Sequence, residues 1–161
     1  MTPARVSSTR PAVPPAAVPL GPPPGHRSYL AFDFGTRRVG VATGNTLTRR
    51  ATPLRTIAAD GAARFDAVAR LVAEWQPDAL VVGIPYHPDG APHDNTARAL
   101  RFARQLHGRF GLVVHPVDER YSTTQAVADG ARDLDAASAA IILDQFLNPP
   151  APSNPPGNPP E

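Results

Sequence analysis

The chain has no cysteine and no lysine, and it contains a single methionine and a single tryptophan. The absence of cysteine excludes disulfide bonds, thiolate metal sites and cysteine nucleophiles. No apolar run approaches the roughly 18 residues of a membrane-spanning helix, and prolines interrupt the first 25 residues, where a signal peptide would need an unbroken apolar segment. We therefore expect a soluble, cytoplasmic protein that has no membrane partner.

Proline is scarce in the middle of the chain and concentrated at its ends. Eight of the 21 prolines lie between Pro3 and Pro24, and seven lie between Pro149 and Pro160. These end segments have few large apolar residues, so burial cannot offset the entropy lost on ordering them. We predict a disordered Pro/Ala-rich arm at residues 1–27, one folded domain at residues 28–148, and a disordered proline-rich tail at residues 149–161.

Every basic residue apart from histidine is an arginine, but the charge is balanced in the predicted domain. Residues 28–148 contain 13 arginines and 13 acids, so the net positive charge comes from the ends of the chain. Net charge therefore does not decide whether the partner is a nucleic acid. Arg98, Arg101 and Arg104 recur every three residues along a predicted helix. They form either a solvated helix face, as charge runs usually do, or a surface that follows phosphates.

Apolar segments alternate with amphipathic ones in an order typical of α/β proteins. Strands are predicted at residues 29–34, 38–43, 53–57, 79–84 and 112–117. A first helix is predicted at 62–75, where apolar residues recur at helical spacing: Phe65, Val68, Val72 and Trp75. A second runs from a cap at Asp94 or Asn95 to His107, and a third begins at the capping-box sequence 122–125. The last helix is predicted at 136–147, after a cap at Asp135 or a near neighbour. Three hairpin-linked strands, followed by helix, strand, helix, strand and helix, is the order of a ribonuclease H-like fold. We predict that fold, with a five-stranded mixed sheet flanked by about four helices.

Asp33 lies inside the first apolar run, where an unpaired carboxylate is costly. Because side chains alternate along a strand, Leu30 and Phe32 face one side of the sheet, while Tyr29, Ala31 and Asp33 face the other. The carboxylate then has two interpretations. It hydrogen-bonds the backbone of the turn that follows, as Asx residues often do, or it belongs to a site.

Further carboxylates occur where other predicted elements begin or end. Asp118 and Glu119 follow the fifth strand, and Asp135 stands at the start of the last helix. With Asp33 they can converge at one edge of the sheet, as an oxygen-only site that suits Mg²⁺ or Mn²⁺. Two such ions can activate water and stabilise the leaving oxygen in phosphodiester hydrolysis. Alternatively, the pair at 118 and 119 are loop acids balanced by Arg120, and Asp135 only caps its helix.

Four segments together resemble the YqgF family, also called RuvX, of pre-16S ribosomal RNA nucleases related to Holliday junction resolvases. They are residues 32–42, residues 81–85 with Asp89 and Gly90, residues 118–123, and residues 135–143. The resemblance covers nearly all of the predicted domain in the right order. It implies a ribonuclease H-like nuclease that uses Mg²⁺ or Mn²⁺ and processes the 5′ end of pre-16S ribosomal RNA, bound as free RNA or within a ribosomal particle.

The resemblance also implies site residues. Asp33, Asp118 or Glu119, and Asp135 are expected to bind metal and to be catalytic, and the sequence does not choose between Asp118 and Glu119. Contacts to the nucleic-acid backbone are expected from Gly35, Arg37, Arg38, Arg120, Ser122 and Thr123.

Alternatives remain open at this stage. Branched DNA is the substrate if the protein is a junction resolvase, and a non-catalytic ribosome-assembly factor would bind RNA without cutting it. Monomer and homodimer both fit. The segment 33–36 also resembles the phosphate loop of actin-like ATPases and sugar kinases, but those enzymes need two lobes and about 120 folded residues supply only one. Family members carry a longer basic segment where this chain has only residues 130–134, so the arginines of residues 1–27 or of 98–104 are hypothesised to replace it.

Overall fold

The computed structural model describes residues 21–119 and 133–149. Its elements are, in chain order, β1 (Ser28–Asp33), β2 (Val39–Asn45), β3 (Ala51–Ile57), α1 (Gly61–Trp75), β4 (Ala79–Ile84), α2 (Thr96–Phe110), β5 (Val113–Asp118) and α3 (Leu134–Leu147). All five predicted strands are present, and the ends of the elements differ from the predicted ones by at most three residues. The helix predicted to begin near Ser122 lies outside the described residues. None of the three helices in the described part of the chain is long and apolar enough to cross a bilayer.

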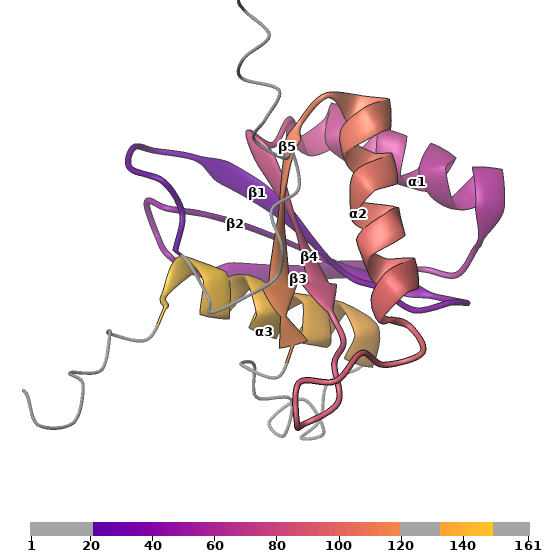
Figure 1. Ribbon diagram of the computed structural model, residues 1–161. Helices are drawn as coiled ribbons and strands as arrows, with labels where there is room; N and C mark the ends of the chain where they lie inside the picture. Colours follow the sequence, from indigo (N-terminus) through magenta and orange to yellow (C-terminus); the bar gives the residue numbers. More distant parts are fainter. Residues whose placement is uncertain (1–20, 120–132, 150–161) are drawn as a thin grey trace, which may run out of the picture.

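The five strands form one mixed sheet in the order β3-β2-β1-β4-β5 (Figure 1). β1 pairs antiparallel with β2, and β2 pairs antiparallel with β3. β1, β4 and β5 run parallel to one another. Because parallel strands end at the same edge of a sheet, the last residues of these three strands are brought together there.

Helices cover both faces of the sheet: α1 and α2 lie on one face, and α3 lies on the other (Figure 1). Leu30 and Phe32 belong to the larger core, which they share with residues of α1 and α2. Tyr29 and Ala31 belong to the second core, which includes residues of α3. All residues of β4 are buried, as expected for a strand covered on both faces. The predicted alternation along β1 is confirmed, and Asp33 has the parity of the face that α3 covers.

The structure corrects one predicted helix face, and it decides which acid caps the last helix, for which the sequence predicted Asp135 or a near neighbour. The buried face of α1 includes Arg64 and Leu71, while Trp75 is 41% exposed, so the face predicted from the apolar spacing is wrong at its carboxyl end. Asp133 rather than Asp135 caps α3, because its side chain accepts a hydrogen bond from the backbone N–H of Ala136 at 3.0 Å. Asp135 therefore lies within the first turn of α3.

Candidate active site

Asp33 is the last residue of β1, and both of its neighbours across the sheet are glycines. It lies opposite Gly40 in β2 and opposite Gly83 in β4. A Cβ atom on Gly40 would lie 1.8 Å from the backbone oxygen of Asp135, so the first turn of α3 passes directly over β2 at this point. Gly40 thus allows Asp135 to approach the strand that neighbours Asp33.

Gly83 makes room on the other side of Asp33. A Cβ atom there would lie 2.5 Å from Cδ1 of Ile142 and 3.1 Å from Cγ of Glu119. The side chain of Glu119, which follows β5 directly, therefore occupies space that a side chain of β4 would fill. Glu119 reaches across β4 in this way and shares a side-chain hydrogen bond with Asp33.

The Asp33–Glu119 pair holds a proton near neutral pH. Burial raises the pKa of Glu119 to about 9, and the nearby charges of Asp33 and Asp118 contribute to the increase. Burial also raises the pKa of Asp33 to about 6; the hydrogen bond from Glu119 opposes this increase and Asp135 adds to it. Asp118 itself is only 2% exposed. Carboxyl groups that are this close and this poorly solvated need a proton or a cation between them.

Asp135 has a different partner. Its Oδ2 atom lies 3.1 Å from Nε of Arg38, and the two side chains are 33% and 63% exposed respectively. Such an exposed ion pair is weak, so little free energy holds Asp135 against the arginine. Asp133 also accepts a hydrogen bond from the hydroxyl of Thr56. Burial acts to raise the pKa of Asp133, but this hydrogen bond and those from the backbone of α3 outweigh it, and the pKa is lowered.

A cavity of about 480 Å³ adjoins Asp135. Gly35, Thr36, Arg37, Arg38 and Asp135 line it. Three of the residues predicted to contact nucleic acid therefore lie together, beside one of the predicted metal ligands. A Cβ atom on Gly35 would lie 2.5 Å from the backbone oxygen of Arg38, so the turn itself requires a glycine at this position. The other three predicted contacts, Arg120, Ser122 and Thr123, lie outside the described residues.

The chemistry of the four acids fits a hard divalent cation, because Asp33, Asp118, Glu119 and Asp135 offer only oxygen atoms. Within residues 21–119 and 133–149, however, no three side chains of the Asp, Glu or His type are arranged to hold a metal ion. Glu119 is engaged with Asp33, and Asp135 with Arg38. A complete ligand set would require Glu119 to release its proton and Asp135 to turn from Arg38.

Gly40 and Gly83 are functional positions that the sequence reasoning missed. Both lie within segments that carry the family resemblance, residues 32–42 and 81–85, but residue type alone gives them no role. The available signal was their place beside valines inside strands, since a glycine within a strand often marks the close approach of another segment.

Comparison of the amino-acid sequence with known proteins gives matches to a family model and to individual relatives that cover about three quarters of the chain. The model of the RuvX family, described as Holliday junction resolvase, matches residues 27–149. A protein of Polaromonas sp. strain JS666 is 68% identical over 123 residues, which cover 76% of this chain and 89% of that protein. A protein of Albidiferax ferrireducens is 63% identical over 121 residues, which cover 75% and 78% of the two chains. Both relatives bear the name "Putative pre-16S rRNA nuclease".

Among solved structures, Thermus thermophilus RuvC in complex with a Holliday junction substrate matches with a TM-score of 0.51. The match covers 74% of this chain and 93% of RuvC, at 14% sequence identity. At that identity the likeness concerns the fold, which is ribonuclease H-like as predicted. The family match and the identity to the curated relatives establish that the chain belongs to the RuvX family.

Proposed function

We propose that this protein is a metal-dependent nuclease that hydrolyses phosphodiester bonds in RNA and processes the 5′ end of pre-16S ribosomal RNA in the cytoplasm. The observation that carries the proposal is the cluster of one buried and two partly buried carboxyl groups, those of Asp118, Asp33 and Glu119, at the edge where three parallel strands end. Carboxyl groups held this close together destabilise the fold unless a proton or a bound cation lies between them. The names of the relatives support RNA as the substrate.

The acids take distinct roles in this proposal. Asp33, Glu119 and Asp135 would hold Mg²⁺ or Mn²⁺, which when bound supplies an activated water and neutralises charge on the leaving oxygen. The hydrogen bond between Asp33 and Glu119 favours Glu119 over Asp118 as the second ligand. Asp118, buried at the end of β5, would then keep the local potential negative and so raise the affinity for a cation.

The turn after Asp33 would position the substrate. Arg38 is exposed and only weakly held by Asp135, so its guanidinium is available to a phosphate oxygen. Arg37 lines the same cavity and adds a second positive charge. Transfer of Arg38 from Asp135 to the phosphate would release the Asp135 carboxylate at the moment when the substrate arrives.

A second candidate function is resolution of four-way DNA junctions, which the description of the family model favours. The two functions are separated by offering the wild-type protein a 5′-extended precursor of 16S ribosomal RNA and a four-way DNA junction, each with Mn²⁺. Cutting of the RNA alone, at a defined site, supports the proposal. Cutting of the junction alone would replace it with the resolvase. Binding of the RNA with no cutting would indicate a ribosome-assembly factor.

A further inference from the structure

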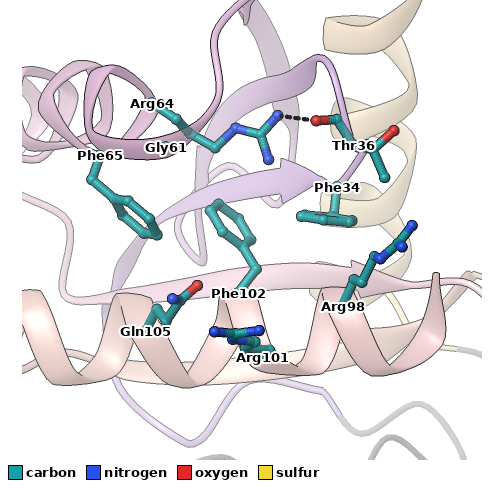
Figure 2. A pocket seen from close by; sticks show the side chains of 9 residues that line it. All are labelled: Phe34, Thr36, Gly61, Arg64, Phe65, Arg98, Arg101, Phe102 and Gln105. Carbon is teal, nitrogen blue, oxygen red and sulfur yellow. Dashed lines mark hydrogen bonds between the residues drawn. The ribbon is translucent and has the colours of Figure 1, made fainter.

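A second cavity, of about 510 Å³, lies between α1 and α2 beside the turn that follows β1. Figure 2 shows three phenylalanine rings gathered between the two helices, with arginines around them. The rings are Phe34, Phe65 and Phe102, and the arginines are Arg64, Arg98 and Arg101. A volume of this size falls within the range of small-ligand sites, roughly 300–1,000 Å³.

The rings form a continuous aromatic floor. The ring centroids of Phe34 and Phe102 are 5.3 Å apart, and those of Phe65 and Phe102 are 5.8 Å apart. Phe65 and Phe102 are buried, whereas Phe34 is only partly buried. Phe34 is therefore the ring that an incoming planar group can reach. Aromatic side chains of this kind stack on unpaired bases with little regard to sequence.

Arg64 holds this floor in place. Although only 5% exposed, it donates from Nε to the backbone oxygen of Ala59 at 2.8 Å and from Nη2 to that of Thr36 at 3.1 Å (Figure 2). Its guanidinium carbon lies 5.5 Å from the centroid of the Phe34 ring. One buried cation thus fixes both the turn after β1 and the position of the accessible ring.

The rim of the cavity is positively charged. Arg98 and Arg101 project from one side of α2, and both are exposed. No acidic side chain is among the nine described residues that line the cavity. An aromatic floor beside exposed positive charge matches a base with its phosphate, and it does not match a neutral apolar ligand.

The position of this cavity connects it with the candidate active site. Thr36 lines both this cavity and the 480 Å³ cavity that contains Arg38 and Asp135. We infer that the cavity between α1 and α2 is a subsite for single-stranded RNA, which holds a nucleotide that flanks the bond to be cut. Its base packs on Phe34 and its phosphate binds Arg98 and Arg101. This inference rests on the proposed function.

The test compares two double variants that remove the same charge. Arg98→Ala/Arg101→Ala removes the rim, while Arg55→Ala/Arg70→Ala removes two exposed arginines, one in β3 and one in α1, that do not line the cavity. Binding of a fluorescein-labelled single-stranded oligoribonucleotide is measured by anisotropy in EDTA, so that nothing is cut. We expect the first variant to raise Kd about tenfold and to reduce the salt slope by about 0.7, the value for one neutralised phosphate of a single strand, and the second to change Kd less than twofold. Equal weakening by the two variants would overturn the inference.

A second readout concerns the base. An oligoribonucleotide that contains 5-iodouridine is irradiated with the wild-type protein, and the cross-linked peptide is identified by mass spectrometry. A cross-link to Phe34 is the expected result, and cross-links confined to peptides outside the cavity would overturn the assignment. If the wild type cuts RNA while the rim variant binds and cuts like its control, the subsite is wrong and the nuclease proposal stands. If the wild type neither binds nor cuts RNA, the proposed function fails, and the subsite fails with it.

Discussion

Glu119→Gln should stabilise the metal-free protein, and the gain should grow as pH rises. Burial raises the pKa of Glu119 from 4.5 to about 9 in the folded state. Between these values the folded chain binds more protons than the unfolded chain, so stability falls as pH increases. Glutamine offers Asp33 an amide N–H donor in place of the carboxyl O–H of protonated Glu119, and it has no proton to lose.

The size of the effect follows from the shift in pKa. A raised pKa reduces stability by about 1.4 kcal/mol for each pH unit above the ordinary value. At pH 7.5, three units above the ordinary value of 4.5, the upper limit is about 4 kcal/mol. Local relaxation lowers this to about 1–3 kcal/mol, which corresponds to a rise in Tm of roughly 4 to 12 °C.

The assay is thermal unfolding in EDTA from pH 5 to pH 9. Wild type and Glu119→Gln should agree near pH 5 and diverge as pH rises. Glu74→Gln, at an exposed position of α1, is the matched control and should follow the wild type. Mn²⁺ should raise the Tm of the wild type at pH 8 more than that of the variant. Parallel pH profiles for wild type and Glu119→Gln would refute the reasoning, because Glu119 would then not be desolvated beside Asp33.

Three further substitutions test the architecture around the acids. Gly83→Ala should reduce stability by about 1–3 kcal/mol in urea unfolding, because its Cβ would meet Ile142 at 2.5 Å. The control Gly108→Ala, which has no atom within 4 Å of its Cβ, should stabilise α2 by roughly 0.5–1 kcal/mol. A neutral Gly83→Ala would show that the strand has room for the added methyl group. Asp133→Ala should cost about 0.5–2 kcal/mol through the lost cap of α3 while Asp133→Asn stays near wild type, and equal losses would show that the charge matters more than the cap. Arg38→Ala should change stability by less than about 1 kcal/mol but weaken RNA binding several-fold in anisotropy, and unchanged affinity would remove Arg38 from the substrate contacts.

Much of the fold could be predicted because local patterns and tertiary structure agree. The alternation along β1 assigned Asp33 to the correct face, and the apolar run of β4 indicated a strand buried on both sides. The predicted burial of Trp75 is wrong, because helical spacing does not show where the sheet beneath the helix ends. The burial of Arg64 was not foreseen, since it depends on carbonyl groups of Thr36 and Ala59 that only the folded chain brings near.

The candidate site was predictable in its acids but not in its spacing. The residue types alone indicated which carboxylates at the ends of strands are candidates. Their convergence depends on the absence of side chains at Gly40 and Gly83, which the residue types do not reveal. The sequence did not decide which acid caps α3, because the cap depends on where the extended backbone ends. The backbone is still extended at Asp133, and its side chain accepts the hydrogen bond from the N–H of Ala136. The proposed preference for Glu119 over Asp118 as a metal ligand depends on the register that places Gly83 beside Asp33, and on the space that Gly83 leaves for the Glu119 side chain.

The most direct test of the central claim is cleavage of the 5′-extended 16S ribosomal RNA precursor by Asp33→Asn, with the wild type and Asp66→Asn assayed in parallel in Mn²⁺. Asp66 is an exposed aspartate of α1, so its substitution controls for the loss of one negative charge. The account predicts that wild type and Asp66→Asn produce the same defined end, that EDTA abolishes the cut, and that folded Asp33→Asn produces none. Cutting by Asp33→Asn at the wild-type rate would contradict the account, because the carboxyl cluster would then not be the catalytic centre.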